Sequence, residues 1–152
     1  MELRALGWRD FWFCLKLARD PFVRSMSMSE SYPTLGEHWL WMSRWKTDPN
    51  RRCWVVMVGG KRIGIVNGIR EGGALGDGAE VGVTLLARYR RLGYGQATIE
   101  DGTRLIWKTL APHVRARIKG QNKASLKAFE NAGYERLTYW AGIHTLISRM
   151  PS

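Results

Sequence analysis

The sequence has little cysteine, no long apolar run and few acidic residues. Its 2 cysteines, Cys14 and Cys53, show no CxxC spacing, so we expect no disulfide framework and a reducing cytoplasm as the location. The longest apolar stretch, Phe11–Leu15, is followed by Lys16 and falls far short of the roughly 20 residues that a bilayer span needs. The first residues also lack a signal-peptide pattern. We therefore expect a cytoplasmic protein without a membrane partner.

The scarcity of acidic residues leaves a strongly basic chain. There are 13 Asp and Glu residues against 24 Lys and Arg residues, which gives a net charge of +11. This charge suits a polyanionic partner, either nucleic acid, an anionic membrane or a small phosphorylated ligand. The basic residues are scattered apart from two clusters, Arg88–Arg91 and Arg115–Lys119, and no helix-turn-helix, RNA-recognition or zinc pattern occurs. Charge alone leaves the class of partner open.

Length and composition indicate one globular domain over residues 1–152, since no repeat or linker interrupts the chain and 45% of its residues are apolar. Strands are expected over Leu3–Leu6, Cys53–Val58, Lys61–Ile69, Glu80–Leu85, Val114–Ile118, Tyr134–Trp140 and Ile143–Ser148. Helices are expected over Trp8–Ala18, Thr34–Lys46, Gly95–Leu110 and Asn122–Asn131. This order predicts an α/β or α+β domain built on a mixed sheet.

Local signals set several of these boundaries. Asp20-Pro21 is interpreted as the end of the first helix, because the residue before a proline avoids the helical region. Thr34–Glu37 has the form of a capping box, and Asn122 stands where an N-cap is expected. Gly59-Gly60 is typical of a two-residue hairpin, and a glycine-rich loop is expected over residues 72–78.

The segment from Glu80 to Gln96 predicts a phosphate-binding loop. A strand runs into Arg90-x-x-Gly93-x-Gly95, and a helix follows at once. Glycines at such a turn let the backbone approach a ligand and leave amide groups free to bind a phosphate or pyrophosphate. A Walker loop is absent, and Thr98 stands where the dinucleotide fingerprint needs its third glycine. The alternative is an ordinary glycine turn, which is disfavoured because these glycines open a helix.

This segment resembles the acyl-CoA-binding motif of the GNAT superfamily of N-acyltransferases, [Q/R]-x-x-G-x-[G/A]. The preceding Glu80–Val83 is similar to the strand E-[IV]-G-[IV] of that superfamily. A second block, Asn122–Tyr134, resembles its N-x-x-[SA]-x-x-x-[YF]-x-x-x-G-[FY] pattern. The resemblance spans nearly the whole chain, more loosely before about Arg51. Arg19–Ser25 and Glu37–Trp41 resemble the branch that acetylates amino-sugar nucleotides, close to the ribosomal-protein acetyltransferases.

The resemblance implies a mixed, mostly antiparallel central sheet flanked by helices and splayed at its fourth strand, where a bulge opens a cleft for the thioester. Backbone amides near the end of that strand are implied to contact the pantetheine, with one polarising the thioester carbonyl. The loop and the start of the next helix are implied to hold the pyrophosphate. The cofactor residues that the resemblance implies are Leu85, Leu86, Arg90, Arg91, Leu92, Gly93, Tyr94, Gly95, Gln96, Asn122, Ser125 and Phe129.

The implied reaction needs a base, because an alkylammonium with a pKa of roughly 10 must lose a proton before attack. Glu80 matches the acidic residue often assigned this role; the alternative is a surface carboxylate paired with arginines. His38 is a second candidate for the base or a substrate contact, and Arg24 is a candidate substrate contact. The alternative for His38 is a structural role on its helix.

The leaving thiolate needs a proton donor, and Phe129 occupies the position where many members of the superfamily have a tyrosine. Tyr134 or Tyr139 is the expected substitute from nearby. Alternatively, the thiolate leaves unassisted, since the pKa of a simple thiol is roughly 8.5, or the domain binds acyl-CoA without efficient catalysis.

The resemblance predicts an acetyl-CoA-dependent N-acetyltransferase acting on a small amine, with an amino-sugar nucleotide as the favoured acceptor. The first alternative is a macromolecular amine, such as a protein N-terminus, a lysine or an aminoacyl-tRNA. The second is a non-catalytic nucleic-acid-binding module, which is not favoured. No metal is expected, because His38, His113 and His144 are dispersed. The protein is expected to be a monomer or a homodimer paired through its last strands.

Overall fold

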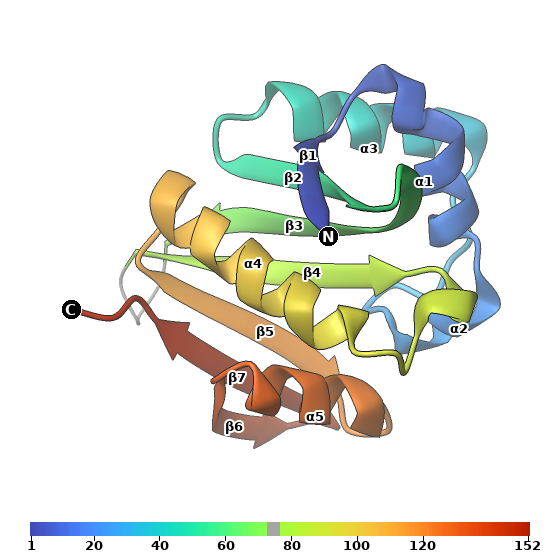
Figure 1. Ribbon diagram of the computed structural model, residues 1–152. Helices are drawn as coiled ribbons and strands as arrows, with labels where there is room; N and C mark the ends of the chain where they lie inside the picture. Colours follow the sequence, from blue (N-terminus) through green and yellow to red (C-terminus); the bar gives the residue numbers. More distant parts are fainter. Residues whose placement is uncertain (73–76) are drawn as a thin grey trace.

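A computed structural model describes residues 1–72 and 77–152 of the chain, so most of the predicted glycine-rich loop lies outside the described residues. Within these ranges one sheet has the strand order β1-β2-β3-β4-β5-β7-β6 (Figure 1). The strands are β1 (Glu2–Ala5), β2 (Arg51–Val58), β3 (Lys61–Glu71), β4 (Gly78–Leu85), β5 (His113–Lys119), β6 (Glu135–Trp140) and β7 (Ile143–Arg149). The helices are α1 (Phe11–Ala18), α2 (Pro21–Met26), α3 (Leu35–Thr47), α4 (Tyr94–Thr109) and α5 (Lys123–Asn131), with short 3-10 turns η1 (Trp8–Asp10) and η2 (Ala87–Tyr89).

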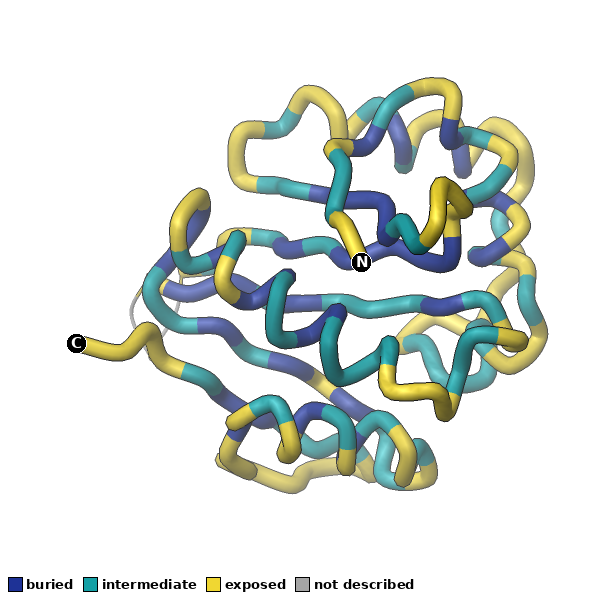
Figure 2. Tube along the Cα trace, viewed as in Figure 1, coloured by how far each residue is buried: buried dark blue, intermediate teal, exposed yellow. Residues whose placement is uncertain are grey.

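The helices cover the two faces of the sheet unequally. Helices α4 and α5 pack on one face, where Val66, Ile106 and Leu146 belong to the larger buried cluster. Helices α1 and α3 pack on the other face over the first strands, where Met42 and Val55 belong to a second cluster. Figure 2 shows the buried middle of the sheet and the exposed outer strand β6, of which all six residues are exposed. The predicted α/β fold with a mixed, mostly antiparallel sheet is confirmed.

The sheet splays at its fourth strand, as predicted. Strand β4 pairs with β3 along its whole length, but its parallel pairing with β5 is limited to Gly78–Glu80 against His113–Arg115. Beyond Glu80 the two strands diverge, and β5 continues to pair with β7. The expected bulge in β4 is wrong, because its register with β3 runs without a shift from Gly78 to Leu85. The splay therefore follows from the limited pairing with β5.

Helix α2 was not predicted, because Asp20-Pro21 was interpreted only as a stop. The same dipeptide begins a new helix: proline occupies the first turn, and the Asp20 side chain accepts a hydrogen bond from the Val23 amide at 3.1 Å. Proline is favoured at that position because its fixed φ suits a helix and its missing N–H has no helical partner there. The capping box at Thr34 and the N-cap at Asn122 are confirmed.

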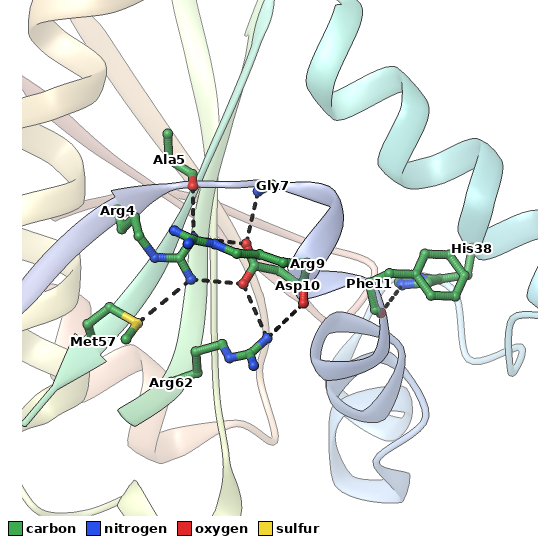
Figure 3. Close-up of polar contacts among 9 residues, drawn as sticks. All are labelled: Arg4, Ala5, Gly7, Arg9, Asp10, Phe11, His38, Met57 and Arg62. Carbon is green, nitrogen blue, oxygen red and sulfur yellow. Dashed lines mark hydrogen bonds and ion pairs between the residues drawn. The ribbon is translucent and has the colours of Figure 1, made fainter. Parts of the chain in front are cut away.

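A buried carboxylate fastens the N-terminal segment to the sheet (Figure 3). Asp10 is fully buried; its carboxylate accepts hydrogen bonds from Arg4 at 2.8 and 3.1 Å and from the Gly7 amide at 2.9 Å, and Arg62 of β3 lies at 3.3 Å. Burial alone raises the pKa of Asp10, but the Arg4 and Gly7 donors hold it below its usual value. This site anchors the segment from which α1 and α2 continue.

Candidate active site

A cleft of about 830 Å³ opens between the end of β4, the loop that follows it, the first turn of α4 and one side of α5 along the length of that helix. Its lining residues come from α4 and α5, which lie on the same face of the sheet (Figure 1), and from the end of β4 beside the splay. Of the predicted cofactor residues, eight line it: Leu85, Arg90, Arg91, Gly93, Gly95, Gln96, Asn122 and Ser125. Seven residues outside the predicted set also line it, among them Phe22 of α2, Val83 of β4 and Lys127 of α5.

The loop before α4 forms a backbone anion site. Arg91 and Gly93 have left-handed conformations, with φ of 61° and 88°. Within the described ranges, the amides of Gly93, Tyr94, Gly95 and Gln96 donate to no protein acceptor. Successive free amides at the N-terminus of a helix favour phosphate groups, and the helix dipole adds to the attraction. The predicted phosphate loop therefore has the backbone geometry that its chemistry requires.

At the end of β4, only the backbone amides on the side away from β3 are free to contact a ligand in the cleft. The Leu86 amide donates to the Ile63 carbonyl at 2.8 Å, which places it on the side of β3. In an antiparallel ladder alternate residues bond to the same neighbour, so the amides of Val83 and Leu85 face the splay. Both residues line the cleft. Leu86 thus cannot use its amide for a ligand, whereas Val83, which was not predicted, can.

Arg90, the first residue of the motif, does not point its guanidinium freely into the cleft. Its Nε donates to the Leu85 carbonyl at 3.1 Å, and its Nη2 lies 3.6 Å from an Asp20 oxygen. The guanidinium also stacks over the Phe22 ring at 4.7 Å. Arg90 therefore joins the end of β4 to the start of α2.

A smaller cavity of about 270 Å³ passes through the splay itself. It shares Phe22, Val83, Leu85, Arg90, Asn122 and Ser125 with the larger cleft. On its other side it is lined by residues of α2 together with Glu80 of β4 and Arg117 of β5. The Glu80 carboxylate forms a bidentate pair with the Arg117 guanidinium, whose Nη2 donates to Oε2 at 3.0 Å. Glu80 thus lines the cavity, as a base would, and it also pairs with an arginine, as a surface carboxylate would. Its surroundings agree with both interpretations of the sequence.

Phe129 of α5 and Tyr134, which follows that helix, are both buried. Phe129 lines the smaller cavity and packs edge-on against Tyr134, with 5.0 Å between ring centroids. Tyr134 is only 3% exposed, and its hydroxyl lies 2.7 Å from the Thr103 hydroxyl of α4. Burial raises the pKa of Tyr134, which opposes ionisation. The structure thus places the hydroxyl of Tyr134 in the core between α4 and the last strands.

Two further cofactor candidates also lie away from the cleft wall. Leu92 is 64% exposed, and the Tyr94 ring packs against Tyr89 and the larger buried cluster. Tyr94 contributes only its backbone amide to the anion site, and Leu92 does not line the cleft. Tyr139, the other expected proton donor, lies on the exposed strand β6 with its ring 4.3 Å from that of His144.

The two candidate substrate residues, Arg24 and His38, line a separate cavity of about 430 Å³. His38 is buried; its Nε2 lies 3.1 Å from the Phe11 carbonyl, and its ring stacks on Trp41 (Figure 3 shows the Phe11 contact). Burial lowers the pKa of His38. The structure brings Arg24 and His38 together, but on the opposite side of α2 from the splay.

In the described part of the chain, no three His, Cys, Asp or Glu side chains are grouped in a way that could hold a metal ion. A search of the same residues for a helix long and apolar enough to cross a bilayer found none.

A family comparison agrees with the fold. The model of the acetyltransferase (GNAT) domain matches residues 1–135. The chain belongs to this family. It is therefore an acyltransferase. No curated protein matches the sequence.

Solved structures share the fold over nearly the full chain. Spermidine N-acetyltransferase from Vibrio cholerae, in complex with CoA and spermine, has a TM-score of 0.85 at 17% identity and covers 98% of this chain and 95% of its own. Ribosomal-protein-alanine N-acetyltransferase from Brucella melitensis has a TM-score of 0.82 at 14% identity, with 99% and 100% covered. An aminoglycoside acetyltransferase in complex with coenzyme A has a TM-score of 0.76 at 15% identity, with 97% and 93% covered.

Proposed function

We propose that this GNAT protein transfers an acetyl group from acetyl-CoA to a primary amine. The observation that carries the proposal is the pair of connected cavities: the larger ends at a backbone anion site, and the smaller passes through the splay to α2. The amides of Gly93 to Gln96 hold the pyrophosphate, while Asn122 and Ser125 border the pantetheine. The CoA complexes of the similar structures support this choice of donor. Residues 1–152 act as one domain in this account.

The proposed chemistry is direct attack of the amine on the thioester carbonyl. The ammonium first passes one proton to a base, and the free amine then attacks, so that the new C–N bond forms as the C–S bond breaks. The second proton that the nitrogen releases on becoming an amide ends on the departing thiolate, which gives CoA as the free thiol. The amide of Val83 or Leu85 stabilises the developing oxyanion, because both face the splay. Glu80 is the proposed base, directly or through water, since it is the carboxylate that lines the smaller cavity.

Ser125 is the proposed donor to the leaving thiolate. It lines both cavities, whereas the hydroxyl of Tyr134 is held in the core by Thr103. A hydroxyl at this position can donate a hydrogen bond without being ionised. Tyr134 then acts as a packing partner of Phe129.

The acceptor is proposed to be a small amine, with an amino-sugar nucleotide favoured. A cavity of about 270 Å³ is at the lower end of the size of small-molecule sites. The proteins with similar structures are named for acetylation of spermidine, of aminoglycosides and of a ribosomal-protein alanine. Proteins of this fold are thus named for amine substrates of several sizes. The macromolecular amine is the alternative, and it is favoured by the net charge of +11 only if the acceptor is RNA-linked.

Thiol release from acetyl-CoA with a panel of amines tests the proposal. The panel contains an amino-sugar nucleotide, spermidine, a peptide N-terminus and an aminoacyl-tRNA, at low and at high salt. We expect acceptor-dependent release that is greatest with the sugar nucleotide. Release only with the tRNA, falling steeply with salt, would assign the alternative, and no release with any amine would contradict the proposal.

A further inference from the structure

The cavity that holds Arg24 and His38 is separate from the acyl-transfer site. No residue lines both this cavity and either of the cavities at the splay. The connection from α2 to α3 divides them: Ser27 and Met28 line the smaller transfer cavity, while Ser29 and Ser31 line the second cavity. Its remaining walls come from the end of α1, from α2, from Pro33, from α3 and from the start of β2.

The side chains around this cavity carry an excess of positive charge. Arg24, Arg44 and Arg51 line it, and among the described residues Glu37 is its one acidic lining residue. The Glu37 carboxylate is already used, because its Oε1 accepts a hydrogen bond from the Thr34 amide at 3.2 Å in the capping box of α3. Arg51 pairs with Asp48 at 3.2 Å. Arg24 and Arg44 have no carboxylate within ion-pair distance in the described parts of the chain.

The Arg24 guanidinium is half-buried and has lost part of its solvation. Its Nη1 donates to the Ser29 and Ser31 carbonyls at 3.0 and 3.2 Å, and its Nη2 lies 3.4 Å from the Ser27 hydroxyl. Its Nε is buried and meets no acceptor within the described residues. Burial lowers the pKa of Arg24. A half-buried guanidinium without an anion loses solvation that no charge partner restores.

We propose that this cavity binds the phosphate group of a small phosphorylated molecule, held by Arg24, Arg44 and Arg51. Guanidinium groups match phosphate oxygens in bidentate geometry, and several of them around one cavity favour a multiply charged anion over a single carboxylate. Trp41, stacked on His38, provides an apolar wall for the rest of the ligand. The site goes beyond the acetyl transfer proposed above, because Arg24 and His38, the candidate substrate contacts, line neither of the cavities at the splay.

The test uses inorganic pyrophosphate as the probe and the full chain saturated with CoA, so that the loop before α4 is already filled. Thermal unfolding is followed against pyrophosphate concentration for the wild type, Arg44→Gln and Arg24→Gln. Arg44→Gln is the primary variant, since the Arg44 side chain makes no hydrogen bond or ion pair in the described structure, and the backbone bond from the Asp48 amide to the Arg44 carbonyl stays in place. Arg104→Gln, on the exposed face of α4 where Arg104 pairs with Asp101, removes the same charge elsewhere.

We expect pyrophosphate to raise the unfolding temperature of the wild type and of Arg104→Gln alike. In Arg44→Gln and Arg24→Gln the concentration needed for half of the shift rises at least tenfold. Absence of a shift in the wild type, or an equal shift in all four proteins, would overturn the proposal. The CoA titration run beforehand reports the acyl-donor cleft by itself, so failure of this site and failure of the proposed function are distinguishable.

Discussion

The two sides of the splay offer different kinds of groups to a ligand. On the side of α4 and α5 these groups are backbone amides, whose positions are set by the left-handed Gly93 and by the start of a helix. On the side of α2 they are side chains from separate elements, such as Glu80 with Arg117 and Phe22 with Arg90. A backbone site leaves a short motif in the sequence. A side-chain site depends on which elements the fold brings together.

The largest expected effect comes from the anchor of the N-terminal segment that leads to α2. Asp10→Ala leaves Arg4 and the Gly7 amide without their buried partner, and we expect a loss of about 3 kcal/mol in the free energy of unfolding. Urea unfolding measures it. Asp101→Ala, which removes an exposed pair with Arg104, is the control and should cost less than about 0.5 kcal/mol. Equal losses in the two variants would show that Asp10 is not the anchor.

The next prediction concerns the proposed base. Two carboxylates pair with alternate arginines of β5: Glu80 with Arg117, and Glu71 with Arg115 at 3.5 Å. Glu80→Gln should lower kcat/KM by about 100-fold, because it removes the proton acceptor, whereas Glu71→Gln should change it less than about twofold. Steady-state thiol release compares the two. If kcat/KM changes less than about twofold in both variants, Glu80 is only a surface partner of Arg117.

Substitutions of two neighbouring arginines of the motif are expected to affect different ligands. Arg90 contacts Asp20 and Phe22 at the start of α2. Arg91 lines the larger cleft, and its side chain makes no hydrogen bond in the described structure. Arg90→Ala should raise KM for the amine about tenfold, and Arg91→Ala should raise the Kd of acetyl-CoA by a similar factor. Calorimetry and initial rates measure the two constants. The reverse pattern would place Arg90 on the pyrophosphate.

The smallest expected effect is a pH dependence of stability. Burial lowers the pKa of His38 in the folded state from its ordinary 6.5, so the unfolded chain binds the proton more readily. The stabilisation by neutral His38 is complete above that ordinary value and is lost as the pH falls below it. His38→Gln should therefore flatten the decline in stability between about pH 7.5 and 5.5. An unchanged decline in the variant would contradict the role of His38.

The comparison also explains what the sequence predicts and what it does not. The predicted strands and long helices are present because hydrophobic periodicity and caps such as Thr34 and Asn122 act locally. The loop motif indicates the anion site for the same reason. Helix α2 was missed because Pro21 both ends one helix and begins another. The Asp10 site was missed because Arg62 lies far away along the chain and meets it only in the folded sheet.

Some of the residues that the resemblance implies line the cleft and others do not. The difference depends on whether the role needs the backbone conformation or a side chain or amide that points into the cleft. Gly93 and Gly95 line the donor cleft, where conformation and small size decide their role. Leu86 and Tyr134 do not reach it, since the pleat of β4 turns the Leu86 amide toward Ile63 and Thr103 holds the Tyr134 hydroxyl. Neither contact is visible in the spacing of a motif. Phe22 and Lys127 also line the cleft. Both lie in segments that carry the resemblance, Arg19–Ser25 and Asn122–Tyr134, but at positions to which it assigns no role.

The most direct test of the central claim is acetyl-CoA binding by Gly95→Asp, measured by titration calorimetry. A side chain at Gly95 has room in the protein, because the nearest atom to an added Cβ is Leu85 Cδ1 at 3.9 Å, but its carboxylate meets the pyrophosphate. Gly36→Asp, at an open position in the first turn of α3, is the matched control. The account predicts wild-type affinity for Gly36→Asp and at least a roughly 100-fold loss for Gly95→Asp. Unchanged binding by Gly95→Asp would contradict it.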